Sequence, residues 1–158
     1  FQDWPEVEEV IVPVGGGGLI AGIALYLKES KPGIRITGVE PENSAFIEHS
    51  LSLGYLNNDF VEKATIADAV AGGLENGAMT FDLVRHYVDR LLTVSEESIM
   101  EAMRTFYEDH QEIVEGAGAL SLAGLLAGRE LFSGKKVVAI VSGGNIEPSR
   151  WRELTGYQ

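Results

Sequence analysis

Four consecutive glycines, Gly15 to Gly18, separate an apolar run at residues 10–14 from a helix-like stretch at residues 19–28. This order predicts a strand, a turn without side chains and then a helix. Glycine enters positive-φ conformations readily, so several N–H groups of the turn can face one point, beside the free N–H groups that begin the helix. No Lys or Arg occurs between Val7 and Tyr26. The turn therefore predicts an anion site built from backbone, with phosphate as the first candidate.

Strand and helix signals alternate along the rest of the chain. Continuous apolar runs suit strands that are buried on both faces, and spacings of three and four suit helices. We expect strands at residues 10–14, 34–39, 90–94 and 135–141, and helices at residues 19–30, 44–54, 80–88, 96–110, 117–131 and 149–154. Asn43 or Ser44 is the expected cap of the second helix and Ser95 that of the fourth, and residues 65–68 form a short strand or a turn.

This alternation predicts a single α/β domain over residues 1–158, with three layers: a mostly parallel sheet and helices on both of its faces. Ligands of such sheets bind at the carboxyl ends of the strands. Both glycine-rich turns, Gly15 to Gly18 and Gly143 with Gly144, follow predicted strands. We therefore expect them at the same edge of the sheet.

Composition excludes several classes of partner. The net charge of −12 and the pI near 4.6 oppose binding to nucleic acid or to an anionic membrane, because both partners would be negative. No uninterrupted apolar run of about 18 residues is present. Because the chain has no cysteine, it predicts neither a disulfide framework nor a thiolate metal site, and a cytoplasmic location is expected.

The glycine turn also satisfies a dinucleotide fingerprint in one register. Gly16, Gly18 and Ala21 occupy the three positions of the G-x-G-x-x-G/A pattern, and Glu40 ends the next predicted strand where a ribose-binding acid is expected. Four adjacent glycines match such a pattern easily, so a nicotinamide-type cofactor is the weaker of two interpretations.

Six short motifs favour the other interpretation. They are residues 12–22 (VPVGGGGLIAG), 38–41 (GVEP), 65–68 (TIAD), 94–97 (VSEE), 115–119 (EGAGA) and 141–145 (VSGGN). In this order and spacing they resemble the carboxyl-terminal half of the fold-type II pyridoxal-phosphate enzymes, in particular the threonine/serine dehydratase and serine racemase family. The resemblance covers nearly the whole chain and implies the large-domain portion of the tryptophan synthase beta-like fold.

The resemblance implies roles for individual residues. The N–H groups of Gly15, Gly16, Gly17, Gly18 and Leu19 would bind the 5′-phosphate of pyridoxal phosphate. Ser142 matches the residue whose hydroxyl hydrogen-bonds the pyridine nitrogen, while Glu115, Gly144 and Asn145 match the surroundings of the cofactor ring. Two structural alternatives stay open: Ser142 as the end of a strand, and Glu115 as an acid that the dipole of a following helix favours.

Three positions depart from the family pattern. Metal-binding members have an acid six residues after the glutamate that corresponds to Glu40, and here that position is Phe46. No metal site is therefore predicted at Glu40. Ala69 stands where glycine is usual, and Gly116 stands where proline is usual. Both departures are expected near the cofactor wall.

The lysine that joins the cofactor as a Schiff base in this family belongs to a Ser-Phe-Lys-x-Arg-Gly motif of the amino-terminal half. None of the five lysines here, Lys28, Lys31, Lys63, Lys135 and Lys136, has that setting. The chain also begins at Phe1. We therefore expect a fragment that lacks the amino-terminal half of its parent and carries no catalytic residue of its own.

The resemblance implies a parent that converts a small hydroxy amino acid into a 2-oxo acid and ammonia, with serine racemisation as an alternative. For the chain by itself, a non-catalytic domain that binds a phosphorylated ligand or self-associates is the competing hypothesis. Loss of half the fold would expose apolar surface, so a homo-oligomer is expected.

Overall fold

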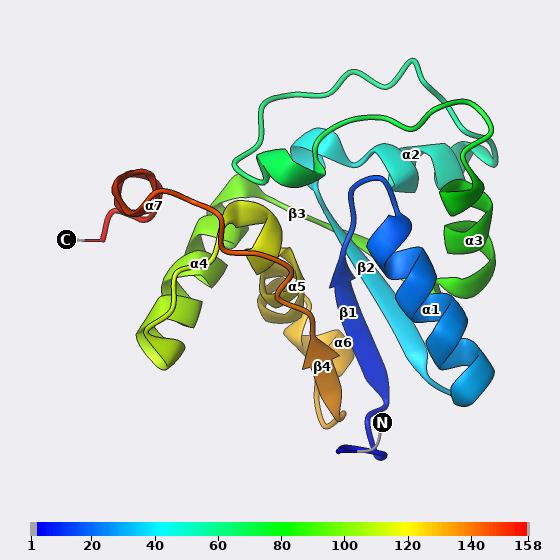
Figure 1. The fold of residues 1–158 in the computed structure, drawn as a ribbon, viewed down its shortest axis with the longest axis horizontal. Helices are drawn as coiled ribbons and strands as arrows, with labels where there is room; N and C mark the ends of the chain where they lie inside the picture. Colours follow the sequence, from blue (N-terminus) through cyan, green and yellow to red (C-terminus); the bar gives the residue numbers. More distant parts are fainter. Residues whose placement is uncertain (1–2, 158) are drawn as a thin grey trace.

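Four parallel strands form the centre of the protein in the computed structural model, which describes residues 3–157 (Figure 1). They are β1 (Glu9–Pro13), β2 (Arg35–Pro41), β3 (Arg90–Val94) and β4 (Val137–Ala139). Their order in the sheet is β3-β2-β1-β4, and β1 pairs with β2 over its whole length. The outermost residues of the predicted domain lie outside the described part of the chain.

Helices cover both faces of this sheet (Figure 1). On one face lie α1 (Gly18–Ser30), α2 (Phe46–Leu53) and α3 (Met79–Tyr87). On the other lie α4 (Glu96–His110), α5 (Gly116–Ala127) and α6 (Arg129–Phe132), and α7 (Pro148–Thr155) packs on α4. The short 3₁₀ turn η1 (Glu42–Ser44) follows β2, and a second one, η2 (Asp68–Val70), precedes α3. The three-layer α/β architecture is confirmed.

Alternation along β1 builds one apolar core on each face of the sheet. Val10 and Val12 pack toward α1, while Ile11 packs toward α5. On the α5 side, the absence of a side chain at Gly124 lets the helix lie directly against Val39 of β2. The small-residue composition of α5 therefore allows it to contact all four strands.

Several predicted boundaries were wrong. The helix expected at 117–131 is interrupted at Gly128, which ends α5 and precedes α6. The strand expected at 135–141 contains only three residues, because the chain leaves the sheet after Ile140 donates to the carbonyl of Ile11. Of the two alternatives for residues 65–68, the strand is not formed, while the 3₁₀ turn η2 begins at Asp68. Ser95 does cap α4, accepting from the amide of Ser98 at 3.2 Å.

At the N-terminal edge of the sheet, the carboxylate of Glu9 is completely buried. It accepts hydrogen bonds from Thr37 Oγ1 at 2.7 Å, from Lys135 Nζ at 3.0 Å and from the guanidinium of Arg90. Burial raises the pKa of this carboxyl. The three hydrogen bonds and the positive charge of Arg90 outweigh burial and hold the pKa below its ordinary value.

Among the described helices, none is long and apolar enough to cross a membrane.

Candidate functional site

The glycine turn leaves its backbone donors free. Gly17 precedes α1 in a left-handed conformation, with φ at 77°, and the first amide of α1 that bonds the preceding turn is that of Ala21, to the carbonyl of Gly17 at 2.9 Å. Within residues 3–157, no backbone hydrogen bond begins at the amides of Gly15 through Leu19. Gly16, Gly18 and Leu19 are exposed. These unpaired donors at a helix N-terminus fit a phosphate group, as the sequence indicates.

Three side chains, those of Ile47, Thr80 and Val84, lie next to Gly17 and form the floor of the glycine turn. A Cβ at this position would come within 3.2–3.3 Å of Ile47 Cδ1 from α2 and of Thr80 and Val84 from α3. Gly15 lies against the backbone of Val70 in η2, whose Cα and carbonyl oxygen would be 2.9 Å from a Cβ. The turn therefore needs glycine for close packing as well as for conformation.

The second glycine-rich segment follows β4 next to the first. Ile11 of β1 pairs with Ala139 of β4, so Ser142 lies three residues beyond the paired position, as Val14 does on the neighbouring strand. Both segments leave the carboxyl ends of adjacent parallel strands. Ser142 is exposed, and its hydroxyl has no hydrogen-bond partner among the described residues, so it is accessible to a ligand.

Glu115 and the start of α5 pack directly on this second segment. A Cβ at Gly118 would collide with the carbonyl of Gly143, and a Cβ at Gly143 would collide with Glu115 Oε1. Glu115 precedes α5 without capping it by its side chain, so its carboxylate is not committed to that helix. A cavity of about 120 Å³ opens here. Its lining comes from three motifs and from α7, through Thr65, Ile66, Asp68, Glu115, Gly116, Asn145, Ile146, Arg150 and Leu154.

The two departures expected near the cofactor wall, Gly116 and Ala69, differ in their surroundings. Gly116, the first residue of α5, lies so close to the loop that a Cβ would collide with the carbonyl of Ile66. Proline has a Cβ, so this backbone arrangement excludes it. Ala69 lies exposed in η2, and nothing in the structure explains why it replaces glycine.

Glu40 is not a free acid beside the glycine turn. Its carboxylate is 1% exposed and accepts from the amides of Ile47 at 2.9 Å and Glu48 at 2.8 Å, at the start of α2. Burial raises its pKa to about 7, against these two hydrogen bonds, which lower it. The described residues contain no cluster of three metal-ligating side chains. Both carboxylate oxygens of Glu40 accept from backbone amides of α2, which leaves few acceptor positions for a ribose hydroxyl or a cation.

The predicted caps of α2, Asn43 and Ser44, were wrong because their side chains bind other segments of the chain. Asn43 donates to the carbonyl of Ala64 and to Glu96, and Ser44 donates to Glu62, so both side chains bind the loop between α2 and α3. Glu96 also accepts from the amide of Ile66 at 2.8 Å. No individual role was assigned to Glu96 from the sequence. Its long-range partners carry no local sequence signal.

Comparison with known proteins identifies the family to which this arrangement belongs. A family model described as pyridoxal-phosphate dependent enzyme matches residues 1–143. The chain belongs to this family. The catabolic L-threonine dehydratase TdcB of Escherichia coli is 38% identical over 162 aligned residues, which cover 99% of this chain and 48% of the relative. The corresponding enzyme of Staphylococcus aureus is 45% identical over 153 residues, covering 95% and 44%.

Comparison with solved structures supports the same family. The processed threonine deaminase isoform 2 of Solanum lycopersicum superposes with a TM-score of 0.90 at 33% identity, covering 98% of this chain and 45% of that one. Maize serine racemase gives a TM-score of 0.85 at 32% identity, covering 99% and 49%. The chain thus spans about half the length of these relatives. It is a threonine dehydratase-like domain of the fold-type II enzymes, whose cofactor is pyridoxal phosphate.

Proposed function

We propose that this chain is the cofactor-holding part of a pyridoxal-phosphate-dependent threonine/serine dehydratase. The observation that supports this most directly is the set of unpaired amides from Gly15 to Leu19, next to an unpartnered Ser142. The amides would hold the cofactor phosphate, and the hydroxyl of Ser142 would bind the pyridine nitrogen. Glu115 and Gly144 would lie along the ring.

When bound, pyridoxal phosphate withdraws electrons from the α-carbon of an amino acid, which the protein must orient and shield. A neutral hydroxyl at Ser142 would leave the ring nitrogen largely unprotonated, in contrast to a carboxylate partner. This moderates electron withdrawal and favours loss of a β-hydroxyl over reactions that need a fully developed carbanion. A hydroxy amino acid would then yield a 2-oxo acid and ammonia.

We further propose that the chain is inactive by itself, because no lysine is suited to bind the cofactor covalently. Four of the five lysines lie at the N-terminal edge of the sheet, opposite the glycine turn. Lys28 pairs with Asp89, Lys135 with Glu9 and Lys136 with Glu6, and Lys31 donates to Pro5 and Val7. Lys63 is exposed in the loop between α2 and α3. The lysine would come from the half of the fold that the relatives possess and this chain does not match.

Titration with pyridoxine 5′-phosphate tests the phosphate role, since this compound has the phosphate but no aldehyde to react with lysines. We expect saturable shifts of the Gly15 to Gly18 amide resonances. Gly17→Asp should abolish the response through crowding by Ile47 and through negative charge.

Gly54→Asp is the matched control, because Gly54 also has a positive φ of 80° but lies at the end of α2, where an added Cβ would meet no heavy atom within 4 Å. A wild-type chain without shifts in the turn, or a Gly17→Asp variant that binds as wild type, would contradict the proposal.

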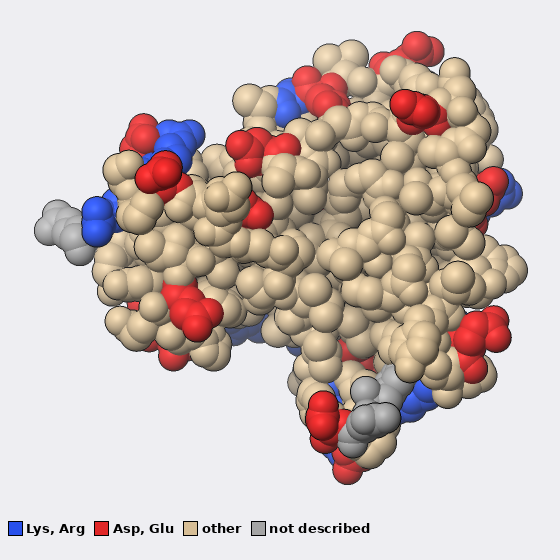
Figure 2. All heavy atoms as spheres, viewed as in Figure 1, with Lys and Arg blue, Asp and Glu red and all other residues tan. Residues whose placement is uncertain are grey.

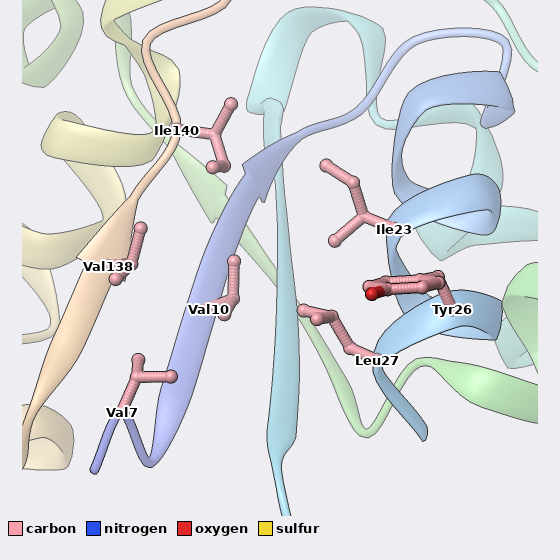
Figure 3. Close-up of a pocket in the computed structure, with 7 residues that line it drawn as sticks. All are labelled: Val7, Val10, Ile23, Tyr26, Leu27, Val138 and Ile140. Atoms are coloured by element: carbon pink, nitrogen blue, oxygen red, sulfur yellow. The ribbon is translucent and has the colours of Figure 1, made fainter. Parts of the chain in front are cut away.

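A second candidate role, self-association, is favoured by an apolar groove of about 240 Å³ between α1 and the β1–β4 edge (Figure 3). The groove is lined by Val7, Val10, Ile23, Tyr26, Leu27, Val138 and Ile140. Figure 2 shows a wide area without charged side chains over β1, β4 and α1, with most acidic residues toward its margin. For a chain with 24 acidic residues, such an area is typical of a contact surface.

Sedimentation velocity over a range of concentrations tests this role. Tyr26 is 67% exposed beside the groove, so Tyr26→Lys should shift the chain toward the monomer. Tyr55 is 60% exposed outside the groove, and Tyr55→Lys should leave association unchanged. A wild-type chain that stays monomeric, or equal effects of the two variants, would exclude the groove as the contact.

A further inference from the structure

Glu40 has an unusual position for a helix cap. It belongs to β2, beside β1 and its glycine turn, while its carboxylate binds the first turn of α2. The residue that immediately precedes α2, Ala45, has no side-chain oxygen to cap it. Within residues 3–157, no basic side chain pairs with Glu40, so the two amides of α2 are the only hydrogen-bond partners of its carboxylate.

The helix that Glu40 holds also forms part of the floor under the phosphate site. Ile47, whose amide donates to Glu40, is completely buried, and its Cδ1 lies 3.2 Å from the position of a Cβ on Gly17. One residue thus links the carboxylate to the turn, by its amide on one side and by its side chain on the other. Because Gly17 has a left-handed conformation that the floor constrains, a shift of α2 would change the direction of the neighbouring amides.

We propose that Glu40 is a positioning residue for the phosphate site, acting through Ile47 on Gly17. This inference rests on the proposed role of the glycine turn. The two carboxylate oxygens accept hydrogen bonds from two successive amides, so they restrain both the translation and the rotation of α2 relative to the sheet. A surface cap such as serine would satisfy one amide without linking the helix to the end of β2.

Removal of the charge distinguishes positioning from simple electrostatics. A carboxylate near a bound phosphate repels it, so loss of the charge by itself would strengthen binding. In Glu40→Gln, the side-chain amide nitrogen faces a backbone N–H and one hydrogen bond is lost. Positioning therefore predicts weaker phosphate binding, opposite in direction to the electrostatic effect.

The experiment is an amide NMR titration of the full chain with inorganic phosphate at about pH 8, above the pKa of about 7 that burial gives Glu40, and at a temperature where every variant is folded. We expect Glu40→Gln to weaken phosphate binding about fivefold and to shift the free Gly17 amide resonance. Glu9→Gln is the matched control, since Glu9 is equally buried but lies at the opposite edge of the sheet. It should bind phosphate as wild type does.

Ile47→Val provides a test that retains the charge, because it removes only the Cδ1 methyl group, which lies 3.2 Å from the position of a Cβ on Gly17. It should weaken binding in the same direction, and the double variant should bind no more weakly than Glu40→Gln. If the wild type binds phosphate and Glu40→Gln binds equally or more tightly, Glu40 has no positioning role while the phosphate site stands. If the wild type shows no response in the turn, the phosphate site itself is refuted, and the inference with it.

Discussion

Replacement of Glu9 by glutamine should be among the most damaging conservative changes in this protein. The carboxylate is 0% exposed and accepts from Thr37, Arg90 and Lys135. Glutamine has nearly the same shape, but it carries no charge and presents an NH₂ group to a donor. Both cations then lose their partner at the N-terminal edge of the sheet.

The expected loss of unfolding free energy depends on how well water can solvate Arg90 and Lys135 once Glu9 is replaced. Breaking a buried ion pair by removing one partner costs about 3–5 kcal/mol. The side chains of Arg90 and Lys135 are each 25% exposed, so water recovers part of their solvation. We therefore expect the lower end of the range, about 3 kcal/mol of unfolding free energy at pH 7.

The assay is urea denaturation of wild type and Glu9→Gln at several pH values. Because the folded-state pKa of Glu9 is below its ordinary value, its contribution is present above about pH 4.5 and is lost as the pH falls through the folded pKa. The difference between the two proteins should therefore shrink in acid.

Glu6→Gln is the control, because Glu6 is 59% exposed and lies 3.9 Å from Lys136. This change should cost less than about 0.5 kcal/mol. A Glu9→Gln effect below about 1 kcal/mol at pH 7, or one that does not depend on pH, would refute the reasoning.

Three further changes test other contacts. Because the folded-state pKa of Glu40 is raised to about 7, the folded state binds the proton of this carboxyl more tightly than the unfolded state does. The free energy of unfolding of the wild type should therefore fall by about 3 kcal/mol as the pH rises from about 4.5 to 7. In a pH series of urea denaturations, Glu40→Gln should show a smaller change of unfolding free energy with pH. Gly118→Ala should lower unfolding free energy by about 2 kcal/mol because its Cβ collides with Gly143; an effect near zero in urea denaturation would show that the loop adapts freely. Ser95→Ala should cost about 1 kcal/mol through loss of its bond to Ser98, measured by thermal melting, and an unchanged melting temperature would contradict the capping role.

Much of the fold was predictable because its signals are local. The apolar runs of β1 and β2 are continuous because both faces of the sheet are covered, and Ser95 precedes α4 by the spacing that an N-cap requires. The glycine turn could be assigned to an anion from neighbouring residues only. Its left-handed Gly17 and unpaired amides agree with that interpretation.

Predictions failed where the deciding partner is distant along the chain. Asn43 and Ser44 have the residue types of a helix cap, but the loop near Ala64 and Glu62 engages them. In the weaker dinucleotide interpretation Glu40 fits a ribose-binding acid by position, yet its oxygens bind the backbone of α2. A polar side chain binds whichever group tertiary packing brings nearest, and the local sequence does not specify that group.

Residue order therefore determined the alternation of strands and helices, which depends on neighbours within a few positions, and the family, which depends on six short motifs in order along the chain. It also predicted a phosphate-type turn at Gly15 to Gly18, and that role stays a prediction. Only the tertiary structure brought Glu115 and Gly143 into contact, placed Ile47 beneath Gly17 and committed Glu40 to α2. Those contacts join segments that are close in space because parallel strands deliver their carboxyl ends to one edge of the sheet.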